Sequence, residues 1–198
     1  SAVFEIYANE DITTPDGTVR AKKDELVATL KTNTKGTATS KQLYLGKYRV
    51  VETVAPYGTV INPEPHTVEL TYSGQNEKVT NTSTSFTNDR QKVEIDLTKI
   101  LEQDEKFNIG NNDEILNVSF GLYADEDLKA SNGTVIPKNG LIEIITCDEK
   151  GKSQFTTDIP IGSYYVKEIS TDNHYILSDK KYPVVFEYAG QDTATVHI

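Results

Sequence analysis

Leu45-Gly-Lys-Tyr-Arg-Val-Val-Glu52 is an alternating, β-branched stretch that the chain repeats as Ile161-Gly-Ser-Tyr-Tyr-Val-Lys-Glu168. The two stretches are 116 residues apart (168 − 52 = 116). Tyr72-Ser-Gly-Gln75 recurs as Tyr188-Ala-Gly-Gln191 at the same separation (191 − 75 = 116). A constant period without a net gap is typical of a tandem array, in which each copy is one structural unit. The sequence therefore predicts two copies of one module, each with a glutamate at the same point of an apolar strand.

The repeat also indicates where the modules begin and end. A chain of 198 residues suits one large domain or two of about 100 residues each, and the repeat favours two. We predict modules at residues 1–90 and 91–198, with a short polar junction near Asn88-Asp-Arg-Gln91. The second copy has a segment before Phe120 that has no counterpart before Phe4, and the first copy runs on past Gln75 for several residues that the second lacks after Gln191. We therefore expect the first module to lack its first strand and the second to lack its last strand.

Composition argues against several classes of partner. The formal net charge of −10 argues against nucleic acid or an anionic membrane surface. No apolar run approaches the roughly 20 residues of a membrane-spanning helix, so we expect no membrane insertion of this sequence. The single cysteine, Cys147, excludes an internal disulfide and a multi-cysteine metal site. His66, His174 and His197 lack metal-ligand spacing and are expected in loops or on the surface, so neither a metal nor a cofactor is predicted.

The alternation of apolar and polar residues predicts an all-β fold. Short β-branched runs are separated by turn dipeptides such as Asp16-Gly17, and helical spacing is scarce, which is typical of an antiparallel β-sandwich. Asn108-Ile-Gly-Asn-Asn-Asp-Glu114 lacks the spacing of an EF-hand calcium loop and is expected to be a polar turn. The predicted strands are Val3–Ala8, Leu26–Thr32, Tyr48–Val54, Thr67–Tyr72, Lys78–Thr87, Lys92–Ile100, Ile115–Ala124, Leu141–Thr146, Gly162–Ile169, Tyr182–Tyr188 and Ala194–Ile198.

The repeated glutamate is predicted to point into the core. Side chains alternate between the two faces of a strand, and Glu52 shares a face with Tyr48 and Val50. The repeat predicts the same orientation for Glu168. A carboxylate among apolar side chains is costly unless a partner satisfies it, so these two positions indicate a site rather than ordinary packing.

A lysine and an asparagine are predicted to face inward as well. Lys99 is the next member of a strand face that carries Leu97, and Asn88 shares a face with Phe86. Burying a lysine and a glutamate costs several kcal/mol unless they pair. A neutral amine is a nucleophile, and a protonated glutamate can donate to an amide carbonyl. Beside an asparagine, such a pair can form a Lys–Asn isopeptide bond and release ammonia, in a reaction that runs once on the protein itself.

Three stretches carry a resemblance to a known family. Tyr48-Arg-Val-Val-Glu-Thr-Val-Ala-Pro-Tyr-Gly58 resembles the glutamate motif of collagen-adhesin B-type (Cna B-type) domains, also called SpaA-type pilin domains. Ala2-Val-Phe-Glu-Ile-Tyr7 resembles that family's early strand, and Phe86-Thr-Asn-Asp-Arg-Gln-Lys-Val-Glu-Ile-Asp-Leu-Thr-Lys99 resembles its module junction. The resemblance covers nearly the whole chain and implies tandem transthyretin-like β-sandwiches.

The resemblance implies a structural stalk module of a Gram-positive surface adhesin or pilin-like protein. Such a protein is extracellular and attached to the cell wall, through an anchor outside this sequence, and its modules have neighbouring modules of the same chain as partners. Carried over to this sequence, the resemblance gives proton-relay roles in isopeptide formation to Glu52 and Glu168, and cross-linking roles to Lys99 and Asn88. Glu52 and Asn88 belong to the first module, whereas Lys99 and Glu168 belong to the second. Neither bond is then complete within its own module in this sequence.

Two departures from the family pattern affect these assignments. The second module replaces Ala-Pro-x-Gly by Ser170-Thr-Asp-Asn-His-Tyr175, so Glu168 is assigned from the repeat alone. Asn81 is a rival to Asn88 because it also lies on an apolar strand face. The spacing to Lys99 favours Asn88.

Other interpretations use the same sequence features. Glu52 and Glu168 face water if they lie on edge strands, and Lys99 reaches solvent if its stem alone is buried. In that case each is a surface charge without a chemical role.

A second hypothesis is an extracellular ligand-binding sandwich whose loops recognise a host protein or glycan. Tyr57, Tyr175 and Tyr182 are its candidate aromatic contacts. A turnover enzyme is not expected, because no nucleophile–base motif recurs. The chemistry predicted here is at most single-turnover self-cross-linking.

Overall fold

The structure is a computed structural model that describes residues 1–130 and 132–198. The chain divides into two compact units. Unit 1 comprises Ser1–Arg90 and Gly190–Asp192, and unit 2 comprises Gln91–Ala189 and Thr193–Ile198. Three residues from the second copy of the repeat therefore belong to the first unit.

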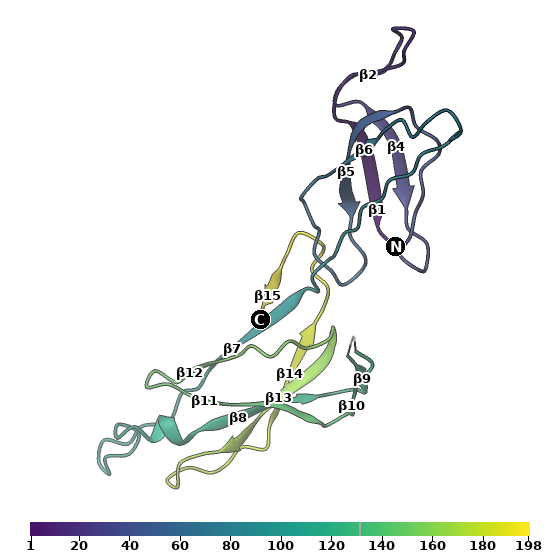
Figure 1. The fold of residues 1–198 in the computed structure, drawn as a ribbon. Helices are drawn as coiled ribbons and strands as arrows, with labels where there is room; N and C mark the ends of the chain where they lie inside the picture. The colour runs from purple at the N-terminus through teal and green to yellow at the C-terminus, as the bar shows by residue number, and fades with distance from the viewer. Residues whose placement is uncertain (131) are drawn as a thin grey trace. The chain divides into compact units, whose positions relative to one another are not determined.

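Unit 1 is built around a four-stranded antiparallel sheet with the strand order β4-β1-β5-β6 (Figure 1). The central strand β5 has nine residues, and its buried positions alternate with partly exposed ones, so one face is turned to the core. A short β2-β3 pair completes the unit. The strands are β1 (Val3–Ala8), β2 (Ile12–Thr13), β3 (Val19–Ala21), β4 (Leu26–Lys31), β5 (Gly46–Val54) and β6 (His66–Leu70).

Unit 2 is a sandwich of two sheets, with the strand orders β11-β8-β13-β14 and β12-β7-β15 (Figure 1). Its main sheets are antiparallel apart from the β15–β7 pair, which is parallel with Val196 opposite Val93. One 3₁₀ helix, η1 (Glu114–Asn117), precedes β8. The strands are β7 (Lys92–Thr98), β8 (Ser119–Ala124), β9 (Leu128–Lys129), β10 (Val135–Ile136), β11 (Leu141–Thr146), β12 (Lys152–Phe155), β13 (Gly162–Ser170), β14 (Lys181–Phe186) and β15 (Thr195–His197).

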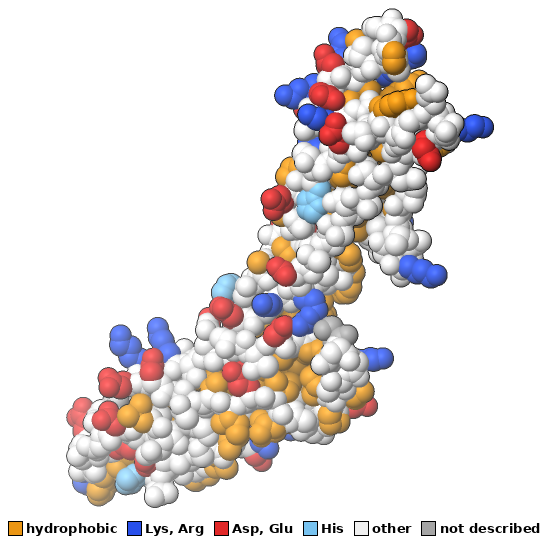
Figure 2. All heavy atoms as spheres, in the orientation of Figure 1, with side chains coloured by type: hydrophobic (Ala, Val, Ile, Leu, Met, Phe, Trp, Pro, Cys, Tyr) orange, Lys and Arg blue, Asp and Glu red, His pale blue; other side chains and the backbone are white. Residues whose placement is uncertain are grey.

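Charged side chains of both signs are mixed on the surface. Asp and Glu outnumber Lys and Arg by 30 to 20, and Figure 2 shows the two kinds interspersed on the visible face. The acidic excess is spread over that face rather than gathered into one field.

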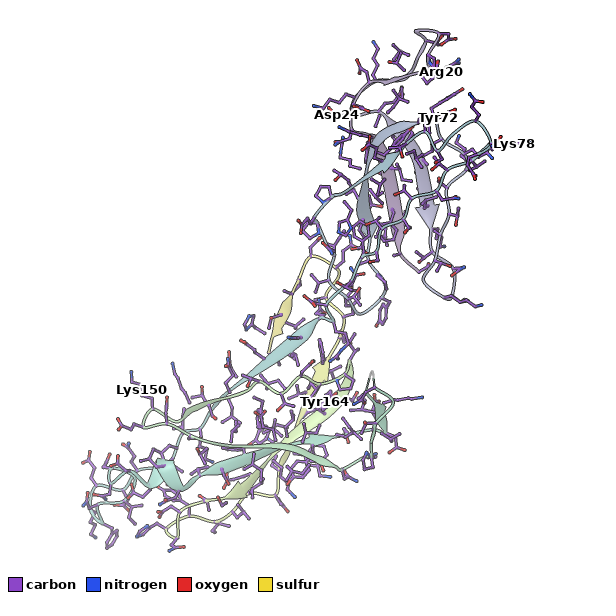
Figure 3. All side chains as sticks on the ribbon, in the orientation of Figure 1. Arg20, Asp24, Tyr72, Lys78, Lys150 and Tyr164 are labelled. Carbon is purple, nitrogen blue, oxygen red and sulfur yellow. The ribbon has the colours of Figure 1, made fainter. Side chains whose placement is uncertain are left out.

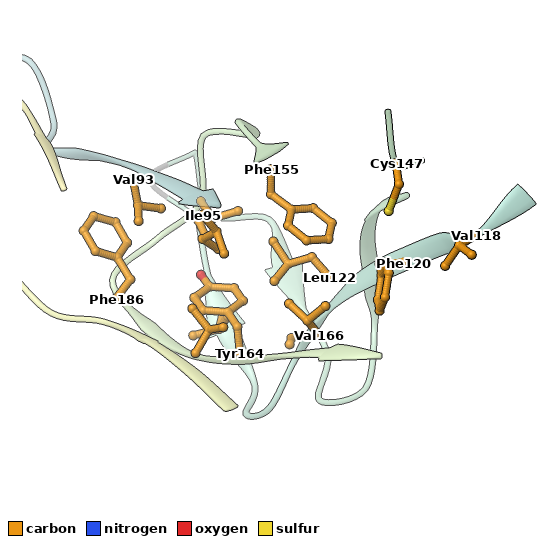
Figure 4. Packing of buried hydrophobic residues seen from close by; sticks show 14 residues of the cluster. Val93, Ile95, Val118, Phe120, Leu122, Cys147, Phe155, Tyr164, Val166 and Phe186 are labelled. Carbon is orange, nitrogen blue, oxygen red and sulfur yellow. The ribbon is translucent and has the colours of Figure 1, made fainter. Parts of the chain in front are cut away.

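Side chains from both sheets fill the core of unit 2. Val93 of β7 and Phe155 of β12 belong to the same buried cluster as Leu122 of β8 and Tyr164 of β13 (Figure 4). Figure 3 shows where Tyr164 lies in unit 2. Phe155 is 1% exposed and Tyr164 is fully buried. The Tyr164 hydroxyl donates a hydrogen bond to the carbonyl of Pro160 (2.5 Å), and burial raises its pKa. The buried hydroxyl of Tyr164 thus has a partner, as buried polar groups generally require.

Most strands lie where the alternation predicts them, but two predictions are wrong. Lys78–Thr87 forms no strand, and Ile115–Asn117 belongs to η1 rather than to β8. In unit 2 the counterpart of the first segment forms β15, which pairs with β7. The described part of unit 1 has no strand equivalent to β7, so Lys78–Thr87 has no ladder partner. The short strands β2, β3, β9, β10 and β12 were not predicted.

The segment Lys78–Thr87 forms no strand pairs, and side-chain packing holds it in unit 1. Phe86 packs on Phe4 and on His66, with ring centroids 4.8 and 3.7 Å apart. The Nδ1 atom of His66 lies 2.8 Å from the hydroxyl of Thr84. The expectation of a loop or surface position is wrong for His66, since this half-buried residue begins β6 and stacks on Phe86.

Replacing Phe155 by Ala should lower the free energy of unfolding of unit 2 by about 3–5 kcal/mol, because the lost ring leaves a cavity. Phe107→Ala is the matched control, since that ring is 67% exposed, and it should change stability by less than about 0.5 kcal/mol. Urea denaturation measures both variants. Equal losses would contradict the placement of Phe155 in the core.

Candidate functional site

Glu52 is buried in unit 1 and bonded to an asparagine side chain. It lies on β5 opposite Phe4 of β1 and is 2% exposed. Its Oε2 accepts hydrogen bonds from the main-chain N–H of Asn62 and from Nδ2 of Asn88, each at 2.7 Å. The same Nδ2 donates to the carbonyl of Val60 (2.9 Å). Both N–H groups of the Asn88 carboxamide are therefore used, and the amide is held against the carboxylate.

The second carboxylate oxygen of Glu52 is in a different situation. Oε1 is buried and has no hydrogen-bond partner among the described residues. A buried oxygen without a donor costs free energy, so a further donor at this point would be stabilising. No lysine forms an ion pair with Glu52 in the part of the chain that the structure describes.

Unit 2 pairs the equivalent glutamate with a lysine. Glu168 lies on β13 opposite Phe120 of β8 and is 4% exposed. The Nζ atom of Lys99, just after β7, lies 3.3 Å from Oε2 of Glu168. The Lys99 side chain keeps 27% of its surface exposed, so its amine reaches a buried carboxylate from a half-buried stem. A buried charge with a charged partner of this kind is tolerated, whereas a lone one is not.

A glycine that the sequence argument did not use positions Lys99. The main-chain N–H of Lys99 donates to the carbonyl of Gly151 (2.7 Å). Gly151 has φ +75°, and a Cβ atom there would lie 2.0 Å from the carbonyl oxygen of Lys99. Only glycine fits both the left-handed conformation and the close approach. The signal available beforehand was the Lys150-Gly151 turn dipeptide.

The buried thiol of Cys147 lies near this pair. It is 5% exposed and follows β11, which ends at Thr146. Burial raises the pKa of this thiol. The charges of Asp148 and Glu168 raise the pKa further, whereas the charge of Lys99 lowers it. The thiol therefore stays protonated and behaves as a small apolar group beside the lysine and the glutamate.

A segment from the second copy of the repeat holds the end of the glutamate strand in unit 1. The side-chain Oε1 of Gln191 accepts from the N–H of Ala55 (2.8 Å), and its Nε2 donates to the carbonyl of Thr53 (3.1 Å). Its main-chain carbonyl accepts from the N–H of Ile61 (2.9 Å). Thr53 directly follows Glu52, and Ala55 lies three residues after it. Sequence reasoning found the repeated glutamine but gave it no role, because its contacts are to main-chain atoms.

The structure brings the four predicted site residues together in pairs. Asn88 contacts Glu52 in unit 1, and Lys99 contacts Glu168 in unit 2. Asn81, the rival candidate, is exposed and forms no hydrogen bond with Glu52. Each unit thus places one carboxylate against one of the two groups that an isopeptide bond would join.

The candidate aromatic contacts of the binding hypothesis lie in different settings. Tyr182 lies within β14, opposite Val166 of β13, rather than in a loop. The Tyr175 hydroxyl donates to the carbonyl of Glu102 (2.6 Å), and Tyr57 is exposed. Of the three, Tyr175 and Tyr57 are the loop residues that the hypothesis requires.

The polar turn before η1 is closed by a buried carboxylate. Oε2 of Glu114 accepts from the main-chain N–H of Asn112 (2.7 Å), and Oε1 accepts from the N–H of Gly110 (3.0 Å). These bonds, led by that from Asn112, lower the pKa of Glu114 from 4.5 to about 2. Among the described residues, no group of three or more His, Cys, Asp or Glu side chains is arranged to hold a metal ion.

Comparison with protein families decides where this chain belongs. The model of the SpaA prealbumin-like fold domain matches residues 1–85 and 103–198. The chain belongs to the SpaA family. Glu52 and Glu168 lie inside the matched SpaA segments, whereas Asn88 and Lys99 lie between them. The all-β, transthyretin-like architecture predicted from the sequence is confirmed.

Solved protein structures are similar to this chain over its whole length. The Bacillus anthracis TIE protein is similar over 100% of this chain at 23% identity, with a TM-score of 0.55. The chain spans 30% of the length of that protein. GBS52, the minor pilin of Streptococcus agalactiae, matches over 100% of this chain and 81% of its own, at 19% identity and a TM-score of 0.32. The comparison with curated proteins gives no match.

Asn88→Asp should destabilise unit 1 at neutral pH and much less in acid. The change places a second carboxylate about where Nδ2 now lies, 2.7 Å from Oε2 of Glu52. Two carboxylates so close cannot both ionise freely, so the loss should be about 1–3 kcal/mol near pH 7 and shrink below about pH 5. Thermal unfolding followed by circular dichroism across this pH range measures it. Asn81→Asp, at an exposed position, should change nothing; a loss independent of pH in Asn88→Asp would refute the contact.

Acid should weaken unit 2 through Glu114. A carboxyl whose pKa is lower in the folded state stabilises the fold above its unfolded pKa, and this contribution is lost as the pH falls through the folded value. Stability should therefore fall as the pH drops from about 4.5 towards about 2. Glu114→Gln should flatten part of that fall in a series of urea titrations, and Glu149→Gln, at an exposed position, should leave the slope unchanged.

Proposed function

We propose that this chain is a structural stalk module of a bacterial cell-surface adhesin or pilin-like protein, stabilised in the full-length protein by autocatalytic Lys–Asn isopeptide bonds. The observation that carries the proposal is the contact of each buried glutamate. Glu52 contacts the side-chain nitrogen of Asn88, which would leave as ammonia, and Glu168 contacts the amine of Lys99, which would act as the nucleophile. Membership of the SpaA family supports it.

The chemistry needs one carboxyl group to act on both reacting residues. The lysine amine loses a proton, attacks Cγ of the asparagine and forms a C–N bond, while the bond from Cγ to Nδ2 breaks. Nδ2 takes up the proton and leaves as ammonia. The position of Glu168 beside Nζ of Lys99 suits removal of the proton that the lysine amine loses. The position of Glu52 beside Nδ2 of Asn88 suits its delivery to the leaving nitrogen.

The sheet of unit 2 supports a bond between its first strand and a strand that ends the module. β15 runs parallel to β7, with His197 opposite Glu94. A strand that continues in the direction of β15 passes Lys99, where the asparagine partner is required. Closing a loop of about 100 residues in this way stabilises a module by roughly 4–5 kcal/mol in the loop-closure model. The bond would also carry tension directly between the two strands, as a stalk requires.

The proposed setting is extracellular, with neighbouring modules of the same protein as partners. In the described part of the chain, the structure contains no helix with the length and apolar character needed to cross a lipid bilayer. The reaction consumes its own side chains and turns over once, so the protein is not an enzyme in the ordinary sense.

The intact mass of a chain extended by one strand at each end tests the proposal. Each isopeptide bond releases one ammonia, so the extended chain should be lighter than its sequence mass by two units of about 17 Da. Glu52→Ala and Glu168→Ala should each prevent the loss of one ammonia, about 17 Da, because each change removes one proton relay. Asn81→Ala is the control and should keep both bonds. Full mass in the extended wild-type chain would refute the cross-link and favour the ligand-binding sandwich.

A further inference from the structure

The outer face of the sheet β11-β8-β13-β14 is turned away from the core of unit 2 and carries lysines without carboxylates. The four strands lie within the described residues and contain two acidic side chains, Glu143 and Glu168. Both lie opposite core residues of β8 and so face inward. The outer positions include Lys167 of β13 and Lys181 of β14. This sheet does not contain β7 or β15, so its outer face does not depend on the first or last strand of unit 2.

The equivalent face of unit 1 carries charges of both signs. On the sheet β4-β1-β5-β6, Lys47 lies opposite Glu69, and Nη1 of Arg49 lies 2.8 Å from Oδ1 of Asp24. The residues 116 positions further along change this balance. The exchanges from unit 1 to unit 2 are Lys47 to Ser163, Arg49 to Tyr165, Glu5 to Gly121, Glu69 to Val185, Val51 to Lys167 and Pro65 to Lys181. A face of mixed charge in unit 1 thus becomes an apolar and basic face in unit 2.

The two lysines of the outer face lie directly opposite each other. Lys167 pairs with Lys181 across β13 and β14, and like charges in this position are destabilising. Within residues 1–130 and 132–198, neither lysine forms an ion pair. The Nζ atom of Lys181 lies 4.6 Å from the ring centroid of Tyr165, and that of Lys167 lies 5.6 Å from the ring centroid of Tyr123. Cation–π contacts hold the two ammonium groups but do not neutralise them, so an anion between them would be stabilising.

The two tyrosine rings form a fixed base for the lysines. Tyr123 and Tyr165 stack with ring centroids 5.1 Å apart and an interplanar angle of 8°. The Tyr165 hydroxyl donates to Oδ1 of Asn139 (3.1 Å), and Tyr165 is 4% exposed. A Cβ atom at Gly121 would lie 2.8 Å from Cε2 of Tyr123, so the glycine makes room for this ring. Each ring is covered by the other ring and by a lysine, so neither offers the open face on which a sugar stacks.

Exposed aliphatic side chains lie on both sides of the lysine pair. Ile144 of β11 is 55% exposed, and Val185 of β14 is 50% exposed. One row across the sheet consists of Ile144, Gly121, Lys167 and Lys181. Nucleic acid and anionic bilayers bind to larger basic fields than two lysines. Aliphatic surface beside two unpaired amines instead complements a polypeptide whose carboxylates lie among apolar side chains.

We propose that the outer face of the sheet β11-β8-β13-β14 binds an acidic, partly apolar segment of another protein. Carboxylates of that segment lie at Lys167 and Lys181, and its apolar side chains cover Ile144 and Val185. The binding is non-covalent and uses no residue of the proposed cross-link. Exposed ion pairs and a few aliphatic contacts give a weak complex, with a Kd on the order of 0.1–1 mM for a short peptide.

A nuclear magnetic resonance titration of the whole chain with a synthetic peptide of glutamate and leucine tests the proposal. Amide signals of Lys167 and Lys181 and methyl signals of Ile144 and Val185 should shift as the peptide is added. Lys167→Gln and Lys181→Gln should each weaken the Kd about threefold, because each removes one ion pair. Lys150→Gln, at an exposed turn position of unit 2, is the matched control and should bind as the wild type does. A wild-type chain that does not bind, or lysine variants that bind equally well, would overturn the proposal.

Two further ligands separate an acidic polypeptide from other anions. A glutamate–serine peptide of the same length and a hyaluronate oligosaccharide carry carboxylates without aliphatic side chains. Each should bind at least about fivefold more weakly than the glutamate–leucine peptide, because neither buries Ile144 and Val185. A smaller difference for the serine peptide would show attraction by charge alone, and a smaller one for hyaluronate would indicate a glycan site. Either result would overturn the proposal, whereas the mass test of the cross-link would be unaffected.

Discussion

Burial of one carboxylate on the central strand of each unit is the constraint around which the rest of the site is arranged. Glu52 and Glu168 occupy core positions where an apolar residue would pack without cost. A charge there needs partners, because desolvation of an ion costs several kcal/mol. In unit 1 the partners are an amide side chain and a main-chain N–H, and in unit 2 the partner is the amine of Lys99. The neighbouring strands and loops hold those partners in reach.

The two units divide one proposed reaction between them. Unit 1 places the carboxylate at the nitrogen that would leave, and unit 2 places it at the nitrogen that would attack. The carboxylates occupy the same repeat position, so the two arrangements together describe the surroundings of a single glutamate that serves both steps. Oε1 of Glu52 has no hydrogen-bond partner among the described residues, so one more donor at this point would be stabilising.

The alternation of residues was enough to predict which strands form and which glutamates are buried, because a period of two is a local property of a strand. Features that depend on distant main-chain atoms could not be predicted in this way. Lys78–Thr87 has the composition of a strand but no partner in the described part of unit 1. Gln191 and Gly151 act through carbonyl and N–H groups, which leave no mark on the sequence of the residues that they touch. Asn88 was favoured over Asn81 by its spacing to Lys99.

The parallel pairing of β7 with β15 also sets the order in which unit 2 is completed. Thr195 pairs with Lys92, a separation of 103 residues (195 − 92 = 103), whereas β8 pairs with β11 and β13, which are much closer to it in the sequence. Contacts of long sequence separation form late, because their loops must be closed first. During synthesis from the N-terminus, the strand that leads to Lys99 emerges early and waits for β15. The strand β7 therefore keeps the edge that pairs with β15 unpaired while the rest of unit 2 is synthesised.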